Sequence, residues 1–200
     1  MAAHSSTYLR LITATLALAL MIGCGPNRAA EPFVPDMDDL SYGGRRHTAV
    51  GTSASGKPVE LAQFAGRFVW VDYAAPWCGP CLRQAPIIQR LEHVFGDKVV
   101  FLTVLTSDQK PGAPATRHTA RVWAQRFRLD PEHVVFGGEW QRFIPQHGVF
   151  SPIGQTLFWK VGWLSETQVR QELQVLRQDW DRWYDENKNS TSVLLSEIGD

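Results

Sequence analysis

The stretch from residue 67 to residue 106 constrains the fold most, because it contains two apolar runs separated by one amphipathic segment. The runs RFVWVDYA (67–74) and KVVFLTVLT (98–106) are nearly uninterrupted and rich in β-branched and aromatic residues, which is typical of strands buried on both faces. Between them, apolar residues recur every three or four positions over 78–95, the period of a helix. A strand, a helix and a strand in close succession predict a parallel pair with a right-handed crossover, and hence an α/β fold.

The last third of the chain adds antiparallel strands to this pair. HGVF (147–150) and QTLFWKV (155–161) are strand candidates separated by SPIG, whose proline and glycine suit a hairpin turn. Ser165 stands three residues before Gln168, a capping box that begins a final helix. We therefore expect a central mixed sheet flanked by helices.

Composition limits the class of protein. The chain has 200 residues, of which 44% are hydrophobic, enough for one ordinary core. Twenty Lys and Arg balance twenty Asp and Glu, so the chain lacks the positive charge of a nucleic-acid binder. We expect one domain and no nucleic-acid partner.

The N-terminus has the pattern of a targeting segment. LITATLALALMI (11–22) is apolar but too short, at about 1.5 Å per helical residue, to cross a bilayer, so residues 1–23 are expected to be a signal peptide. MIGCG resembles the bacterial lipoprotein cleavage box, which implies that Cys24 becomes a lipidated N-terminus; the alternative is an ordinary signal peptide with an incidental cysteine. A lipid anchor implies attachment to a membrane at the periplasmic or extracytoplasmic face of the cell envelope.

Changes in composition predict the domain boundaries. Residues 24–56 are rich in proline and glycine and are expected to form a flexible tether. The folded domain is expected over 57–185. Residues 186–200 have no apolar period and are expected to form a loose C-terminal tail.

The cysteines leave three interpretations open: half of a metal site, a structural disulfide or a redox pair. If Cys24 is acylated, Cys78 and Cys81 can pair only with each other or with another molecule. A structural zinc site needs about four ligands, and the six histidines are scattered without ligand spacing. We therefore expect no metal and no cofactor.

A helix that starts at the CGPC motif would give each cysteine a separate role. Cys78 would lie at the helix N-terminus, where free N–H groups favour a thiolate, while Cys81, one turn further, would be more buried. Cys78 would attack a substrate disulfide, and Cys81 would resolve the mixed disulfide. Asp72, six residues before Cys78, could lie under the helix start and exchange a proton with Cys81; alternatively, it ends a strand facing water.

VDYAAPWCGPCLRQAP resembles the thioredoxin active-site segment, including Asp72, Trp77 and the Gly-Pro between the cysteines. Over residues 57–185 the order of elements is similar to the membrane-tethered thioredoxin-like oxidoreductases of bacterial envelopes, known for cytochrome c maturation and periplasmic disulfide reduction. The resemblance implies a thioredoxin-like fold. It also implies a cis peptide at Pro145, which would face the sulfurs, and substrate contacts from Trp77, Pro145 and the backbone of Ile144.

Two features depart from that family. Gln84 stands where the tethered reductases often have a glutamate, so Asp72 would have to serve as the base. The segment 108–140 exceeds the thioredoxin minimum and is expected to be an insertion before the cis-proline; it includes an amphipathic helix over 117–127 and EHVVFGGEW, a short edge strand or an extended loop.

The resemblance implies an extracytoplasmic thiol-disulfide oxidoreductase, most simply a reductase of protein disulfides in cytochrome c maturation or envelope redox homeostasis. Such a reductase would need a membrane-embedded electron donor. The first alternative is a dithiol oxidase or isomerase of secreted proteins. The second is a non-catalytic binding module with a permanent Cys78–Cys81 disulfide.

Overall fold

The computed structural model describes residues 49–96, 98–138 and 143–198. The expected signal peptide, Cys24 and most of the expected tether lie outside the described residues. In chain order the elements are β1 (Ala49–Ser53), β2 (Pro58–Glu60), the 3₁₀ helix η1 (Leu61–Phe64), β3 (Phe68–Ala74), α3 (Gly79–Phe95), β4 (Val99–Leu105), α4 (Arg117–Phe127), β5 (Val134–Phe136), β6 (Gln146–Phe150), β7 (Thr156–Val161) and α5 (Glu166–Ile198).

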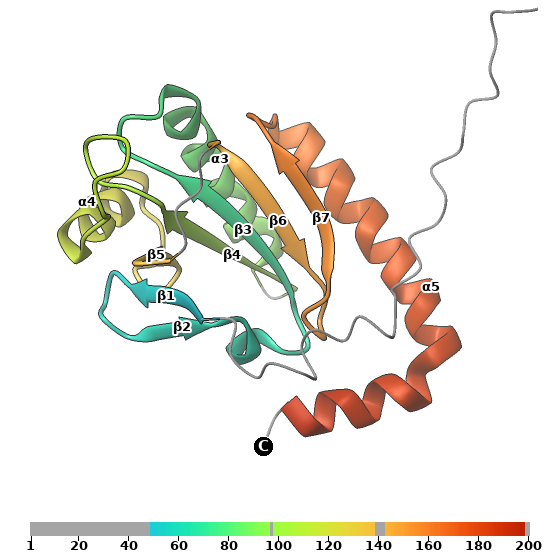
Figure 1. The fold of residues 1–200 in the computed structure, drawn as a ribbon. Coiled ribbons are helices and arrows are strands. Elements are labelled where there is room, and N and C mark those ends of the chain that lie inside the picture. The colour runs from blue at the N-terminus through green and yellow to red at the C-terminus, as the bar shows by residue number, and fades with distance from the viewer. Residues whose placement is uncertain (1–48, 97, 139–142, 199–200) are drawn as a thin grey trace, which may run out of the picture. The chain divides into compact units, whose positions relative to one another are not determined.

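The described strands form one seven-stranded mixed sheet in the order β2-β1-β5-β4-β3-β6-β7 (Figure 1). β3 pairs with β4 in parallel, as the strand-helix-strand pattern predicts, and β4 pairs in parallel with β5. β6 and β7 form the expected antiparallel hairpin, and β6 lies antiparallel to β3. The predicted thioredoxin-like arrangement of a mixed sheet with flanking helices is confirmed.

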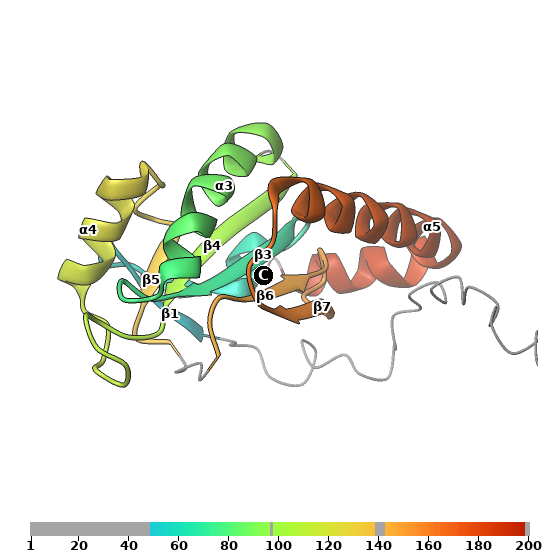
Figure 2. The same ribbon diagram turned by 90° about the horizontal axis from the view of Figure 1, so that it is seen from above.

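The two faces of the sheet have different cores. Trp70 of β3 and Phe101 of β4 are register partners and belong to a large cluster that includes buried residues of α3, α4 and α5. The alternate residues, such as Val71 and Leu102, belong to a smaller cluster with β2. Side chains alternate between faces along a strand, so α3, α4 and α5 share one face of the sheet (Figure 2), whereas η1 packs with the smaller cluster.

The folded region begins and ends differently from our expectation. β1 starts at Ala49, inside the expected tether, and is held by pairing with β2 and β5. α5 continues to Ile198, so most of the segment 186–200 is helical where we expected a loose tail. The physical reason is that a formed helix adds one hydrogen bond per residue, so it can extend beyond its apolar stripe. No helix within the described ranges is long and apolar enough to span a bilayer.

The segment 108–140 supplies α4 and β5. Thr116 caps α4 through its side chain, which accepts a hydrogen bond from the backbone N–H of Thr119. β5 lies between β1 and β4, so it is an internal strand where we expected an edge strand or a loop. The guanidinium groups of Arg117 and Arg121 both donate to the carbonyl oxygen of Ala54, which ties α4 to the turn after β1.

Candidate functional site

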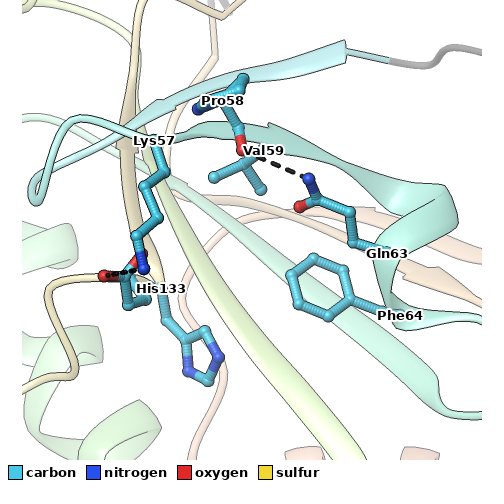
Figure 3. Close-up of a pocket in the computed structure, with 7 residues that line it drawn as sticks. Lys57, Pro58, Val59, Gln63, Phe64 and His133 are labelled. Atoms are coloured by element: carbon cyan, nitrogen blue, oxygen red, sulfur yellow. Dashed lines mark hydrogen bonds and ion pairs between the residues drawn. The ribbon is translucent and has the colours of Figure 1, made fainter.

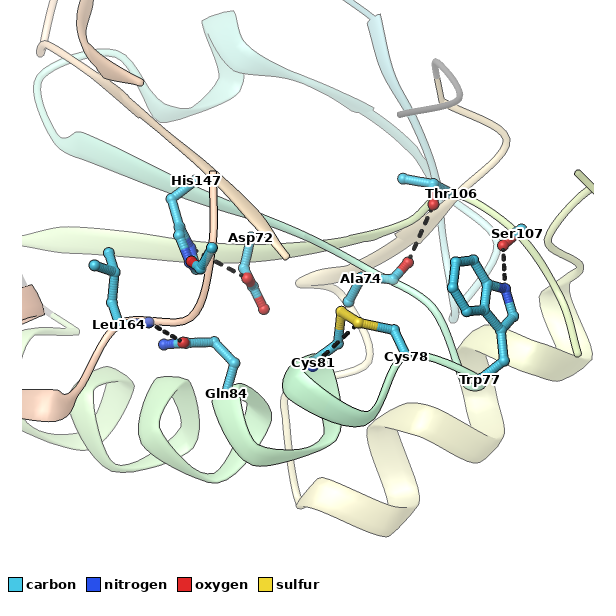
Figure 4. Close-up of a disulfide and its surroundings, with 11 residues drawn as sticks. Asp72, Ala74, Trp77, Cys78, Cys81, Gln84, Thr106, Ser107, His147 and Leu164 are labelled. Carbon is cyan, nitrogen blue, oxygen red and sulfur yellow. Dashed lines mark hydrogen bonds and ion pairs between the residues drawn. A yellow bond between two sulfur atoms is a disulfide. The ribbon is translucent and has the colours of Figure 1, made fainter. Parts of the chain in front are cut away.

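The two cysteines of the CGPC motif form a disulfide at the start of α3 (Figure 4). Cys78 is the N-cap residue, and its sulfur accepts a hydrogen bond of 3.2 Å from the backbone N–H of Cys81. Pro80 occupies the first turn, where a missing N–H has no intrahelical partner to lose. Cys81 is fully buried, while Cys78 is 4% exposed, so the outer sulfur belongs to the residue at the helix end. The roles of Cys78 as the attacking cysteine and of Cys81 as the resolving cysteine stay a prediction.

The loop between β3 and α3 is held by bonds to the end of β4. The backbone N–H of Thr106 donates to the carbonyl oxygen of Ala74 over 3.0 Å. The indole Nε1 of Trp77 donates to Oγ of Ser107 over 2.8 Å (Figure 4). Trp77 is nevertheless 40% exposed, so its ring is fixed beside Cys78 and still available to another molecule. Sequence analysis did not identify Ser107, whose partner lies thirty residues away.

The peptide bond between Ile144 and Pro145 is cis, as the resemblance implies. β6 starts directly after it, and Gln146 is the register partner of Tyr73 near the end of β3. Pro145 therefore lies at the same end of the paired strands as the loop that carries Cys78. Its carbonyl oxygen accepts a hydrogen bond of 2.8 Å from the N–H of Gly162, and Ile144 packs against the cluster that contains both cysteines.

Asp72 is fully buried in the middle of the sheet, so the alternative that it faces water is wrong. It lies on the same face of β3 as Trp70 and Ala74, which share a cluster with both cysteines. Its register partner on β6 is His147, also fully buried, with Nδ1 3.2 Å from Oδ1 of Asp72. Sequence analysis missed His147, although an ionisable residue in the strand after the cis-proline was a usable signal.

Gln84 makes one structural contact through its side-chain oxygen. Its Oε1 accepts a hydrogen bond of 2.9 Å from the backbone N–H of Leu164, in the loop that leads from β7 to α5. The residue is fully buried on α3. This hydrogen bond joins α3 to the loop.

A separate pocket of about 340 Å³ lies beside the β1–β2 hairpin (Figure 3). The polar groups that line it already have partners. Nζ of Lys57 lies 3.2 Å from the Glu132 carboxylate, and Nδ1 of His133 lies 2.6 Å from the Glu92 carboxylate. None of the residues that line this pocket belongs to the set around the disulfide, so the candidate site is the disulfide and its neighbours.

The mixed sheet, the cis-proline and the disulfide at a helix N-terminus define a thioredoxin-fold protein with a dithiol-disulfide site. The sequence profile of the Redoxin family matches residues 31–141, which is more than half of the chain. The chain belongs to the Redoxin family.

Individual curated relatives match only part of this chain. The chain is 25% identical over 100 residues to the thiol-disulfide oxidoreductase ResA of Bacillus cereus, a match that covers 50% of this chain and 58% of the relative. The chain thus matches somewhat more than half the length of such relatives. It is 40% identical over 45 residues to the thioredoxin of Rhodospirillum rubrum, or 22% of this chain and 42% of that protein.

A solved structure supports the fold. A secreted thiol-disulfide isomerase from Corynebacterium glutamicum superposes with a TM-score of 0.55 at 14% identity and covers 66% of this chain and 85% of its own. At this level of identity the similarity concerns the fold alone.

Proposed function

We propose that this protein is an extracytoplasmic thiol-disulfide oxidoreductase that works mainly as a reductase of protein disulfides. The observation that carries the proposal is the position of Cys78 as the N-cap of α3, with Cys81 buried one turn behind it. Free N–H groups at a helix start stabilise an anion, so the reduced form of Cys78 is the better nucleophile.

The reaction proceeds in two exchanges. The Cys78 thiolate attacks one sulfur of a substrate disulfide, the substrate S–S bond breaks, and the first substrate sulfur leaves as a thiolate. Cys81 then loses its proton and attacks the sulfur of Cys78, which releases the second substrate thiolate and leaves the Cys78–Cys81 disulfide. Two electrons pass to the substrate, and the disulfide form is the oxidised product of the cycle.

The neighbouring residues support these exchanges. Asp72 lies on the face of the sheet that packs against α3 and is proposed to take the proton from Cys81. Trp77, with its exposed ring, and the cis-proline Pro145 are proposed to contact the substrate. The backbone of Ile144 is proposed to pair with the substrate chain in the manner of a strand.

The reductase direction needs an external source of electrons, because the compartment outside the cytoplasm does not keep thiols reduced. A membrane-embedded electron donor is therefore the proposed partner. The leader pattern at 1–23 and the lipidation pattern at Cys24 support a membrane-anchored protein of the cell envelope. Client proteins in cytochrome c maturation or in envelope redox homeostasis are consistent with a location in the cell envelope.

Reduction of insulin disulfides, with dithiothreitol as the electron source, tests the proposal. The parent protein is expected to accelerate insulin precipitation, and Cys78→Ser is expected to be inactive, because the attacking sulfur is gone. Cys81→Ser is expected to accumulate a mixed disulfide with its clients. A parent protein no faster than Cys78→Ser would leave only a binding module with a permanent disulfide.

A dithiol oxidase or isomerase is the second candidate, because the same Cys78–Cys81 pair can carry out the exchange in either direction. The reduction potential separates the two directions. A value near the roughly −270 mV of thioredoxin supports the reductase, whereas a value near the roughly −120 mV of a strong oxidant supports the oxidase.

A further inference from the structure

His147 and Asp72 form a buried pair beside the disulfide. Nδ1 of His147 lies 3.2 Å from Oδ1 of Asp72, which is within ion-pair distance, although the angle is not that of a regular hydrogen bond. On the other side of the ring, Nε2 lies 3.1 Å from the carbonyl oxygen of Gly162. Within the described part of the chain, neither oxygen of Asp72 has another hydrogen-bond partner. The ring therefore stands between one acceptor and one carboxyl group.

The partners of the two ring nitrogens limit where protons can lie in the pair. A carbonyl oxygen can only accept, so Nε2 of His147 must carry a proton to bond Gly162. If that were the ring's only proton, the lone pair of Nδ1 would face the carboxyl group of Asp72. A carboxylate there would be repelled and left buried without a counterion, which is costly. One more proton must lie between the two groups, on Nδ1 or on the carboxyl, and the pair is then neutral overall.

The pair lies on the face of the sheet that packs against α3 and the disulfide. Figure 4 shows the Asp72 carboxyl group between the His147 ring and the disulfide. The ring of His147 also packs on Trp70, with 5.6 Å between the ring centroids, and Trp70 shares its cluster with both cysteines.

Few other groups on the packed elements can exchange a proton with the pair. β4 places Thr103 beside Asp72, and α3 contributes Gln84, neither of which titrates. β7 places Lys160 opposite His147, but that side chain is exposed. Of the charged groups on α3, Arg83, Arg90 and His93 are exposed, and Glu92 pairs with His133. Tyr73 of β3 packs against the cluster on the opposite face of the sheet. Among the described residues, the buried titratable groups in the cluster on the pair's own face are the two cysteines.

We infer that His147 is a positioning residue that lets Asp72 accept the proton of Cys81. The inference rests on the proposed exchange reaction. As Cys81 loses its proton, that proton binds Oδ2 of Asp72, and the proton already shared with the ring resides on Nδ1 of His147. The imidazolium then balances the new thiolate, the thiolate attacks the Cys78 sulfur, and the pair returns the proton to solvent or to the leaving thiolate.

The test is the pH dependence of the second exchange in the full-length reduced protein. An aromatic disulfide reagent releases one coloured thiolate when Cys78 attacks and a second when Cys81 resolves, so the two rates separate. His147→Leu is expected to slow the second release about tenfold at neutral pH and to move its rise to higher pH, because no imidazolium then balances the thiolate that forms on Cys81. The first release is expected to keep its rate. Asp72→Asn is expected to slow the second release at least as much, and the double variant to slow it no further than Asp72→Asn alone.

His133→Leu is the matched control, since His133 also pairs with a carboxylate, the partly buried Glu92, away from the disulfide. Its second release is expected to follow the parent's pH profile. An unchanged profile in His147→Leu, or an equal change in His133→Leu, would overturn the inference. A parent protein that releases no first thiolate would instead contradict the proposed function.

Nitrogen NMR of the ring in the reduced parent protein needs no variant and so does not depend on folding of His147→Leu. We expect a proton on Nε2 of His147 at neutral pH and an Nδ1 resonance that changes in Asp72→Asn. A neutral ring protonated on Nδ1, with bare Nε2, would overturn it whether or not the protein is an enzyme.

Discussion

The two faces of β3 differ in chemistry although their residues alternate along one strand. On one face, Val69 and Val71 pack with residues such as Leu102 of β4, in a cluster that is aliphatic where the strands meet. On the other face, Asp72 lies between Trp70 and Ala74 and approaches His147. Both faces are almost completely buried, so exposure does not distinguish them.

In its described part, the chain tolerates buried polar groups on only one of these two faces. The aliphatic face is held by burial alone, which contributes about 25 cal/mol per Å² of apolar surface removed from water. The face under α3 instead carries buried polar atoms that make few hydrogen bonds within the described residues, including the Asp72 carboxyl and the Gln84 amide nitrogen. Such groups lower stability, and they cluster on the side of the sheet that packs against the disulfide.

Leu102→Ala should break the aliphatic face and give the largest effect. We expect the free energy of unfolding to fall by about 2–5 kcal/mol, because a fully buried leucine is replaced by a cavity. Chemical denaturation measures the change. Val122→Ala, at a side chain that is 45% exposed, should change stability by less than about 0.5 kcal/mol. The folded fraction of Leu102→Ala should keep the parent's rate of disulfide exchange; a slower rate would mean that the two faces are not independent.

Gln84→Ala should affect the face under α3 without touching the sulfurs. The N–H of Leu164 would lose its buried acceptor, so we expect a loss of about 1–3 kcal/mol in the free energy of unfolding. Gln63→Ala is the control, since its amide also accepts from a backbone N–H, that of Glu60, and donates to the carbonyl oxygen of Pro58, but is exposed. The rate of the first exchange by Cys78 should stay within about twofold of the parent's, a small effect on the scale of general acid-base contributions. A large loss of that rate would assign Gln84 to the reaction itself.

Glu166→Gln should give the smallest effect, at the exposed edge where α5 begins. A hydrogen bond from Arg90, followed by one from Arg170, holds the pKa of Glu166 below its ordinary value of 4.5. A carboxyl whose pKa is lower in the folded state stabilises the fold above its ordinary pKa, and this contribution disappears as pH falls through the lowered value.

Thermal unfolding at several pH values measures this difference. Glu166→Gln should therefore have a slightly lower Tm than the parent at neutral pH, and the gap should close in acid. Glu172→Gln, on the same helix, controls for the loss of one negative charge. A gap that widens toward acid pH would contradict the assigned direction.

Much of the fold could be predicted from local sequence. The apolar runs at 67–74 and 98–106 predicted β3 and β4 to within a residue at each end, because strands buried on both faces need continuous apolar side chains. The helix start at Cys78 was predicted from the local chemistry of the CGPC motif. The cis peptide at Pro145 was predicted from the family resemblance. Residues 186–198 were assigned wrongly, since they have no apolar stripe and helix continuation does not require one.

The residues that can react are already evident in the amino-acid sequence: two cysteines around Gly-Pro and a single carboxyl in an apolar strand. Which groups surround them depends on how distant strands pair in the folded protein. His147 meets Asp72 because β6 pairs antiparallel to β3 in one register, and Ser107 meets Trp77 because β4 lies parallel to β3. Such contacts join residues far apart in the chain, and a shift of register by one residue would turn His147 to the other face of the sheet.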